Sequence, residues 1–315
     1  MSQFPGRPLN DQKSVEDFLQ FALDFIDFVD FENLVPDIVN SELGVVGVAE
    51  KTPTLSSSLN RTFKYRDDIR RWKLRKKIVD ELSSIKRLAK DDDLELGKGG
   101  ALPLTDVKSE KQAFIIVGPP ASGKSGISEK LADMHGAVII DSDYAKRKLP
   151  EYRQFTYGSS LVHDESSAII RGFAKDPGKC QSLYEICVDK EYNFVIPTVG
   201  SNYSSILSLA STLKDENGYK VHLILVALSK RKATIRAALR FYETKRYVPL
   251  SLIFDIWGND PWLTYFYLRD KHSKVFKSFG AVSTDVPKNS ESIRFDMQGE
   301  SPVSIFTQKD VKIEW

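Results

Sequence analysis

A glycine-bounded loop between an apolar run and a helical pattern constrains the fold of this chain more than any other feature. The apolar run covers residues 113–117, and the segment Gly118-Pro-Pro-Ala-Ser-Gly-Lys-Ser125 follows it directly. This order of strand, Gly-x-x-x-x-Gly-Lys-Ser loop and helix is the signature of a phosphate-binding P-loop. The glycines let backbone N–H groups turn towards phosphate oxygens, and the helix N-terminus adds the positive end of its dipole. The sequence therefore predicts binding of a nucleoside triphosphate, which we expect to be ATP, with GTP as the alternative.

Two side chains of the loop have expected roles. Lys124 is predicted to reach the β- and γ-phosphates, and Ser125 to place its hydroxyl on Mg²⁺. The expected nucleotide-binding residues are Gly118, Pro119, Pro120, Ala121, Ser122, Gly123, Lys124, Ser125 and Gly126.

Strands and helices alternate from about residue 110 to residue 275. The expected strands are 113–117, 137–140, 193–196 and 222–228, and helical patterns lie between them. Such alternation predicts an α/β fold with a P-loop kinase-like parallel sheet and crossover helices. Three short β-prone pieces, 293–295, 303–306 and 311–313, are expected to form an edge hairpin in the tail.

The region before this domain is expected to be helical and is divided by charge. Residues 11–50 hold ten acidic residues and one basic residue, whereas residues 61–90 hold twelve basic and four acidic residues. We expect the basic run 70–77 to be a solvated helix face that pairs with the acidic segment. The predicted domains are a helical N-terminal region at 1–95, a linker at 96–108 and a kinase domain with its β-prone tail at 109–315.

Composition excludes several classes of protein. The net charge of +2 gives no general reason to expect nucleic-acid binding, and two cysteines cannot form a disulfide framework. Neither a signal peptide nor an apolar stretch long enough to span a bilayer is visible. We therefore expect a cytoplasmic protein that does not bind membranes.

Carboxylates and arginines follow two of the expected strands. The second strand ends in Ile140-Asp-Ser-Asp143, and ligands of parallel sheets bind at the carboxyl ends of strands. One carboxylate is expected to help hold Mg²⁺ and the other to deprotonate an attacking hydroxyl. A basic cluster after the fourth strand contains Lys230, Arg231, Lys232, Arg236, Arg240, Lys245 and Arg246. Of these, Arg240 and Arg246 are predicted to neutralise the transferring phosphoryl group.

The fourth strand ends in Ser229 rather than in an acid. A Walker-B aspartate is therefore missing at the position where motor ATPases and GTPases carry it. This favours a small kinase whose base follows the second strand.

Residues 110–275 resemble the zeta toxin family of bacterial kinases. Val138-Ile-Ile-Asp-Ser-Asp143 is similar to the family strand that carries the catalytic aspartate, and Val162–Ile169 to its helix start with histidine and glutamate. Lys146, Pro150 and Tyr152 stand where the family has a lysine, a proline and an aromatic residue. Arg240-Phe-Tyr-Glu243 and the spacing from Arg246 to Pro249 resemble the two phosphate-binding arginines, the first displaced by one position.

The resemblance implies a kinase that uses ATP and Mg²⁺, phosphorylates a hydroxyl of UDP-N-acetylglucosamine and is toxic to cells. It assigns catalysis to Lys124, Asp143, Arg240 and Arg246, with Asp143 as the base, and the metal to Ser125 and Asp143. The substrate-binding residues that it implies are Asp141, Lys146, Tyr152, Thr198, Gly200 and Ser201.

One departure from the family leaves the acceptor open. After the third strand the family has an acid and often an arginine, whereas this chain has Ile196-Pro-Thr-Val-Gly-Ser201, with Pro197 and Ser201 at those positions. A related plant-pathogen effector phosphorylates NAD, so NAD or another nucleotide is the alternative acceptor. Two further functions stay open, namely a nucleotide-dependent binding or adaptor protein and a nucleic-acid end kinase that uses residues 70–77.

The family also implies a partner. Zeta toxins are held inactive by a small helical antitoxin, and residues 11–95 are a candidate for the same inhibition in cis. A separate small helical protein is the second candidate for the inhibitor. For the location, secretion into a host as an effector is the alternative to the cytoplasm.

Overall fold

The computed structural model describes residues 6–25, 30–173, 180–287 and 290–310. The chain forms two compact units, each assembled from separate stretches of sequence. The helical unit contains the residues up to Leu102, Ile140–Ile186 and Ala237–Ser251. The sheet unit contains Pro103–Ile139, Cys187–Arg236 and the residues from Leu252 onwards.

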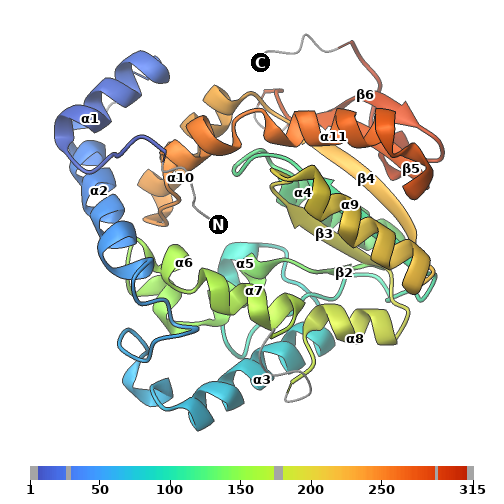
Figure 1. Ribbon diagram of the computed structural model, residues 1–315, viewed down its shortest axis with the longest axis horizontal. Coiled ribbons are helices and arrows are strands. Elements are labelled where there is room, and N and C mark those ends of the chain that lie inside the picture. Colours follow the sequence, from blue (N-terminus) through green and yellow to red (C-terminus); the bar gives the residue numbers. More distant parts are fainter. Residues whose placement is uncertain (1–5, 26–29, 174–179, 288–289, 311–315) are drawn as a thin grey trace. The chain divides into compact units, whose positions relative to one another are not determined.

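The sheet unit is built on six strands in the order β2-β3-β1-β4-β5-β6 (Figure 1). The strands are β1 (Gln112–Val117), β2 (Val138–Ile139), β3 (Phe194–Thr198), β4 (Lys220–Ala227), β5 (Ser278–Ser283) and β6 (Ile293–Gln298). All neighbours are parallel except β5 and β6, which are antiparallel. The predicted α/β fold with a parallel sheet is confirmed, and the first four strands match the expected ones within a few residues.

Helices cover this sheet as crossover connections require. Helix α4 (Lys124–His135) packs on β1, β2 and β3, and α11 (Asp260–Lys271) packs on β4 and on α9 (Tyr203–Ser211). Strands β1 and β4 are buried along almost their whole length, as expected for parallel strands covered on both faces. The remaining elements of this unit are the short helical segments Thr212–Glu216, Leu252–Trp257, Ser273–Val275 and Pro302–Ile305.

The tail differs from its predicted edge hairpin. Residues 293–298 do form a strand, but its partner is β5, which the sequence analysis missed (Figure 1). The piece 303–306 lies mostly in a 3₁₀ turn, and 311–313 lies outside the described residues. Strand β5 reads Ser-Phe-Gly-Ala-Val-Ser, whose small residues give no apolar alternation. Gly280 is needed there because a Cβ atom would lie 2.3 Å from Cγ2 of Val303.

The helical unit confirms the expected helical character of the N-terminal region. Its helices are α1 (Gln12–Asp17), α2 (Phe31–Gly44), α3 (Asp68–Ser84), α5 (Ser142–Lys148), α6 (Gly158–Leu161) and α7 (His163–Arg171). Shorter helical segments are Phe18–Ala22, Val45–Ala49, Phe63–Tyr65, Asp91–Asp93 and Pro150–Arg153. Two further helices, α8 (Leu183–Asp189) and α10 (Lys230–Thr244), begin in one unit and end in the other.

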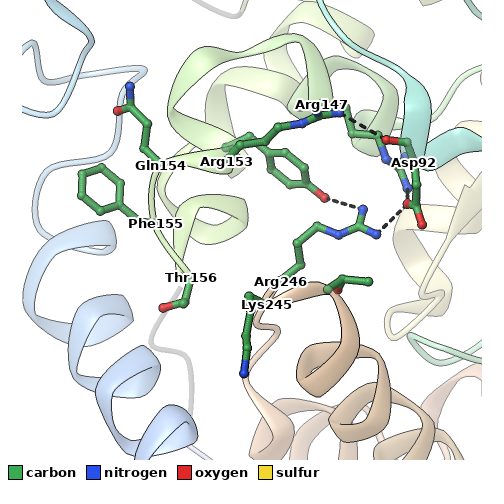
Figure 2. Close-up of a pocket in the computed structure, with 10 residues that line it drawn as sticks. Asp92, Arg147, Arg153, Gln154, Phe155, Thr156, Lys245 and Arg246 are labelled. Atoms are coloured by element: carbon green, nitrogen blue, oxygen red, sulfur yellow. Dashed lines mark hydrogen bonds and ion pairs between the residues drawn. The ribbon is translucent and has the colours of Figure 1, made fainter.

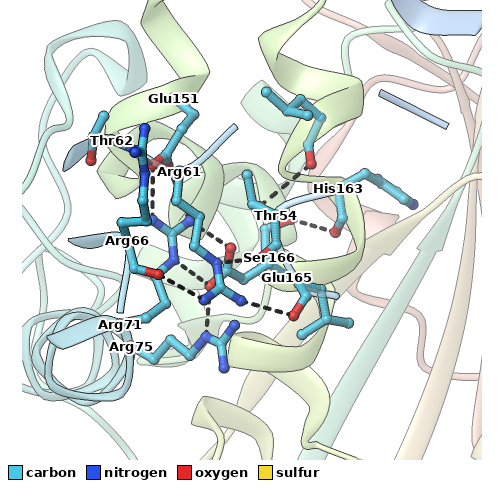
Figure 3. Close-up of polar contacts among 12 residues, drawn as sticks. Thr54, Arg61, Thr62, Arg66, Arg71, Arg75, Glu151, His163, Glu165 and Ser166 are labelled. Carbon is cyan, nitrogen blue, oxygen red and sulfur yellow. Dashed lines mark hydrogen bonds and ion pairs between the residues drawn. The ribbon is translucent and has the colours of Figure 1, made fainter. Parts of the chain in front are cut away.

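A buried ion-pair cluster fastens α3 to the segment that follows α5. The Arg71 guanidinium lies 2.9 Å from Oε1 of Glu151 and 2.6 Å from Oε2 of Glu165, and all three side chains are fully buried. Arg75 adds a contact of 2.6 Å to Glu165. Figure 3 shows both arginines directed at this carboxylate. The cluster brings α3 of the N-terminal region into the same core as residues 150–165.

The expectation that the basic run 70–77 is a solvated face that pairs with the acidic segment 11–50 is wrong for Arg71 and Arg75. The other basic residues of the run are exposed as expected, namely Arg70, Lys73, Lys76 and Lys77. Arg71 and Arg75 share one face of α3 at i,i+4 spacing, and that face turns inward to Glu151 and Glu165. The acidic segment has different partners, since Asp37 pairs with Lys245 at 2.7 Å. Helical periodicity shows which residues share a face, but not which distant element covers that face.

The first part of the segment predicted as a linker, residues 96–102, is packed in the helical unit. Lys148 is fully buried, and its Nζ donates to Glu81 at 2.7 Å and to the carbonyls of Glu95 at 3.0 Å and Gly99 at 2.7 Å. A Cβ atom on Gly100 would lie 2.0 Å from the carbonyl oxygen of Ile85. The chain therefore turns tightly against the end of α3 before it enters the sheet unit.

Both cysteines, Cys180 and Cys187, are unpaired, and burial raises the pKa of the Cys187 thiol to about 12. Within the described residues, no helix is long and apolar enough to cross a bilayer.

Candidate active site

The P-loop connects β1 to α4 in the sheet unit. The backbone N–H of Gly118 donates to the carbonyl of Val199 at 3.1 Å, and a Cβ atom on Gly118 would lie 2.5 Å from the carbonyl oxygen of Val226. Gly123 has a φ of +85°, which glycine adopts without steric cost. Ala121 also has a left-handed backbone, with a φ of +59°. The loop therefore runs so close to β4 that its first glycine cannot carry a side chain.

Lys124 and Ser125 lie where the motif predicts them. The Lys124 ammonium folds over the loop and donates to the carbonyls of Gly118 and Pro119, each at 2.7 Å. Ser125 and Gly126 are exposed in the first turn of α4, and nothing lies within 4 Å of a Cβ atom built on Gly126. The N-terminus of α4 is thus accessible to an anion, as a phosphate-binding loop requires.

The predicted acceptor residues at the end of β3 lie beside this loop. Thr198 pairs in register with Val117, the residue before the P-loop. Gly200 has a φ of +74°, and a Cβ atom there would lie 2.5 Å from Cγ1 of Val117. Ser201 is exposed. Residues 198–201 therefore pass along the carboxyl edge of β1, at the start of the P-loop.

The two aspartates after β2 open helix α5 in the helical unit. Asp141 is the N-cap residue, and its Oδ1 accepts from the backbone N–H of Asp143 at 2.9 Å. Oδ1 of Asp143 pairs with Nζ of Lys146 at 2.9 Å. Lys146 lies in the last turn of α5, which begins at Ser142.

The two carboxyl groups have opposite pKa shifts. The positive charge of Lys146, one turn away, lowers the pKa of Asp143 well below its usual value. Burial, together with the negative charge of Asp143, raises the pKa of Asp141 to about 6. Burial alone would lower the pKa of Lys146, but the charge and hydrogen bond of Asp143 and the charge of Asp141 together outweigh it and raise that pKa. At neutral pH, Asp143 is therefore ionised, and its side chain is 48% exposed.

The two predicted arginines lie near each other and near Tyr152, and Arg240 also lies near Asp143. The charge of Arg240 contributes to the lowered pKa of Asp143, while burial lowers the pKa of Arg240 itself. Among the described residues, Nε of Arg240 has no hydrogen-bond partner. Arg246 donates through Nη1 to Oη of Tyr152 at 3.1 Å and through Nη2 to Oδ1 of Asp92 at 2.6 Å. Arg246 is thus held by a tyrosine that was predicted and by an acid that was not.

Asp92 is a site residue that sequence reasoning missed. Figure 2 shows Arg147 and Arg246 converging on its carboxylate, at 3.6 and 2.6 Å. Burial would raise the pKa of Asp92, but the hydrogen bond and charge of Arg246, with the charges of Arg147 and Arg240, together outweigh this and lower it. The signal in the sequence is the triplet Asp91-Asp-Asp93, whose composition is typical of a linker.

A cavity of about 470 Å³ opens beside this arginine pair. Its wall combines cations with aromatic rings and includes the acid Asp92 (Figure 2). The lining residues are Asp92, Arg147, Tyr152, Arg153, Gln154, Phe155, Thr156, Thr244, Lys245 and Arg246. A cavity of this composition suits an anionic ligand that carries a ring.

The predicted site residues thus form two groups, each assembled inside one unit. The nucleotide group in the sheet unit comprises residues 118–126 with Thr198, Gly200 and Ser201. The acid–arginine group in the helical unit comprises Asp141, Asp143, Lys146, Tyr152, Arg240 and Arg246. The sequence predicted the members of both groups, and their individual roles stay predictions.

Residues 101–257 match the family model described as zeta toxin. The chain belongs to the zeta toxin family. The match begins ahead of β1 and ends after α10, so it includes the P-loop, Asp143, Arg240 and Arg246. Membership of this family, together with the P-loop, makes the chain an ATP-binding kinase, that is, a phosphotransferase.

Several solved structures are similar to the chain. One belongs to the PezAT chromosomal toxin–antitoxin system of Streptococcus pneumoniae, with 18% identity over 57% of this chain and 72% of that chain and a TM-score of 0.45. A complex of AvrRxo1-ORF1 with AvrRxo1-ORF2 shows 17% identity over 79% of this chain and 73% of that chain, with a TM-score of 0.43. A gluconokinase from Sinorhizobium meliloti shows 16% identity over 57% of this chain and 86% of that chain, with a TM-score of 0.31. No curated protein matches the chain.

Proposed function

We propose that this chain is a Mg²⁺-dependent small-molecule kinase, which transfers the γ-phosphoryl group of ATP to a hydroxyl of a nucleotide-sugar or a similar metabolite. UDP-N-acetylglucosamine is the first candidate acceptor, and its phosphorylation would be toxic to the cell. The observation that carries the proposal is the ionised, half-exposed Asp143, which pairs with Lys146 and lies near Arg240. Such an aspartate is charged and exposed, so it can bind and deprotonate an acceptor hydroxyl, and it lies among the cations that phosphoryl transfer uses.

Chain connectivity supports a joint role for Asp143 and the P-loop. Strand β2 lies in the same parallel sheet as β1 and ends at Ile139, so its carboxyl end lies at the edge from which the P-loop leaves. Asp141 follows two residues after that end, and Asp143 four residues after it. Both aspartates thus follow a strand of this sheet within four residues along the chain, which motivates the joint role proposed here.

The proposed reaction is a direct displacement. The acceptor oxygen forms a bond to the γ-phosphorus, the bond from that phosphorus to the β,γ-bridging oxygen breaks, and ADP leaves. Asp143 accepts the proton of the hydroxyl. Arg240 and Arg246 neutralise the charge on the moving phosphoryl group, while Lys124 stabilises the β- and γ-phosphates.

The residues on the chain suit Mg²⁺ because they offer oxygen. The Ser125 hydroxyl and the Asp143 carboxylate would hold the ion together with phosphate oxygens and water, the ligands that Mg²⁺ prefers. Within the described part of the chain, no group of three or more histidine, cysteine, aspartate or glutamate residues could hold a metal. This agrees with a kinase ion that takes most of its ligands from the nucleotide. The ion would neutralise charge on the phosphates when bound.

A second acceptor class is favoured by the loop after β3. Pro197 and Ser201 remove the acid and the cation that zeta toxins direct at their sugar substrate. Thr198, Gly200 and Ser201 still pass beside the P-loop and offer hydroxyl and backbone groups. NAD or another nucleotide is therefore the alternative acceptor, with Asp141, Lys146 and Tyr152 as further substrate contacts.

We further propose that the N-terminal region inhibits the kinase while it stays packed in the folded chain. The predicted domain limits, 1–95, 96–108 and 109–315, separate an inhibitory segment from the enzyme. The buried contacts of Arg71 with Glu151 and Glu165 argue against a segment that dissociates. Asp92 would instead inhibit through one contact. Its carboxylate pairs with Arg246 and so competes with the γ-phosphate for that arginine. A separate small helical antitoxin is the alternative inhibitor.

The test is transfer of label from γ-labelled ATP in the presence of Mg²⁺, with the full chain. UDP-N-acetylglucosamine, NAD or no acceptor is supplied, and Asp143→Asn serves as the blank. Asp164→Asn, an exposed aspartate of α7, is the matched control. Label that moves to one acceptor in the wild type and the control, but not in the blank, supports the kinase and names its acceptor class. ATP binding without transfer to any of a broad set of nucleotides and nucleotide-sugars would instead favour a binding or adaptor protein.

A further inference from the structure

A threonine beyond the family match lies against the P-loop. Thr284 follows β5, and its Oγ1 donates to the carbonyl oxygen of Ser122 at 2.7 Å, in a buried contact. Its methyl group faces Gly123, since a Cβ atom on that glycine would lie 3.3 Å from Cγ2 of Thr284. Neither the P-loop motif nor the family match, which ends at residue 257, assigns a role to this residue.

Thr284 is itself held on two sides. Its backbone N–H donates to the carbonyl of Ala227 at 3.2 Å, at the end of β4. Its carbonyl accepts from Nη2 of Arg236 at 2.8 Å. Beside it, Asp285 pairs with Lys232 at 2.7 Å, and both lysine and arginine come from the first turns of α10. The hydroxyl therefore stands on a fixed support between β4 and α10.

The peptide that this hydroxyl holds is the one that matters for phosphate binding. In a trans peptide the C=O and the N–H point in opposite directions. Because the Ser122 carbonyl is held towards Thr284, the N–H of Gly123 must point away from Thr284. If this peptide turned over, the Ser122 carbonyl would face the position of the phosphates, where N–H groups are required.

The loop has a reason to need such a restraint. Ala121, the residue before Ser122, has a φ of +59°, a conformation that is unfavourable for a residue with a Cβ atom. Gly123, whose N–H belongs to the held peptide, has a φ of +85° and gives little resistance to a change of φ. Ser122 is fully buried, yet its Oγ has no partner among the described residues, so its side chain does not fix the peptide.

We propose that Thr284 is a positioning residue for the nucleotide, which keeps the Ser122–Gly123 peptide turned so that the N–H of Gly123 binds phosphate. The inference rests on the P-loop as an ATP site but not on the identity of the acceptor. It makes the segment after β5 part of the nucleotide-binding machinery, although it lies some 160 residues along the chain from the loop.

The test compares three variants of the full chain for their affinity for ATP and Mg²⁺, measured by calorimetry without an acceptor. Thr284→Val removes the hydroxyl and keeps the shape, and Thr284→Ser restores the hydroxyl. Thr234→Val is the matched control, because that buried threonine donates at 2.7 Å to the carbonyl of Lys230 in its own helix. We expect Thr284→Val to weaken ATP binding about tenfold, the upper end for one hydrogen bond. Thr284→Ser and Thr234→Val should bind as the wild type does.

Thermal unfolding of each variant separates positioning from stability. If both valine variants lower the unfolding temperature to a similar extent and Thr284→Val alone weakens ATP binding, the positioning role holds. Wild-type affinity for ATP in Thr284→Val, or equal loss in the serine and valine variants, would overturn it. A wild type that binds ATP but transfers no phosphoryl group would count against the proposed function and leave this inference intact.

Discussion

Replacement of Arg71 by methionine should destabilise the helical unit more than any surface change on the same helix. Arg71 makes four hydrogen bonds to buried carboxylates, at 2.9 and 3.1 Å to Glu151 and at 2.7 and 2.6 Å to Glu165. Methionine fills a similar volume but donates no hydrogen bond. Glu151 would then keep the hydrogen bond from the backbone N–H of Thr62, at 2.7 Å. Glu165 keeps the contact of 2.6 Å with Arg75.

The expected loss is about 3–5 kcal/mol, the cost of breaking a buried ion pair by removing one partner. The assay is urea denaturation followed by far-UV circular dichroism, with Arg70→Met as the control. Arg70 is 62% exposed and pairs with Asp67, so its replacement should change the free energy of unfolding by less than about 0.5 kcal/mol. The double variant Arg71→Met/Glu151→Met should lose less than the two single variants together, because it leaves fewer buried charges unpaired.

The same cluster predicts a direction for acid unfolding. Burial would raise the pKa of Glu165, but the hydrogen bonds and charge of Arg71 outweigh this and lower it. The stability that Glu165 contributes is therefore present above the unfolded pKa and is lost as the pH falls through the lower, folded value. Arg71→Met should shift acid unfolding to higher pH. Equal stability of Arg71→Met and Arg70→Met, with unchanged acid unfolding, would refute the reasoning.

Three further variants test the site. Lys124→Ala should reduce phosphoryl transfer by about 100-fold or more, whereas Lys130→Ala, an exposed change on the same helix, should not; comparison of initial rates checks this. Asp92→Asn should lower the KM for ATP and raise the rate at limiting ATP, because it weakens the competitor for Arg246; an unchanged KM would count against inhibition by Asp92. Gly200→Ala should impair folding or nucleotide binding, since a left-handed φ of +74° and a contact of 2.5 Å leave no room for a methyl group; wild-type affinity and unfolding temperature would contradict this.

The nucleotide group could be predicted because its chemistry is local in sequence. Residues 118–125 combine glycines, a lysine and a serine at the spacing that a phosphate requires, between an apolar run and a helix. The strands β1 and β4 are long apolar runs, which a parallel sheet buries on both faces. Asp143 was predicted for a related reason, because ligands of parallel sheets bind at the carboxyl ends of strands and Asp143 follows the end of β2 by four residues; its role stays a prediction.

The missed features depend on partners far along the chain. Strand β5 is short and rich in small residues, and Gly280 has a role only once residues 301–303 have packed on it. Asp92 lies in an acidic triplet whose composition is typical of a solvated linker. Its contact with Arg246, over 150 residues away, is the outcome of tertiary packing. Arg71 was predicted to be on a solvated face because a charge pattern does not reveal that two glutamates lie opposite.

The proposed chemistry depends on Asp143 more directly than on any other residue. The decisive measurement is the rate at which Asp143→Asn transfers label from γ-labelled ATP to the acceptor that the wild type uses, at saturating ATP and Mg²⁺. Loss of the base should lower this rate by about 100-fold or more, while the affinity for ATP stays near that of the wild type. A variant that transfers phosphoryl groups at the wild-type rate would contradict the assignment of Asp143 as the base, and with it the proposed mechanism.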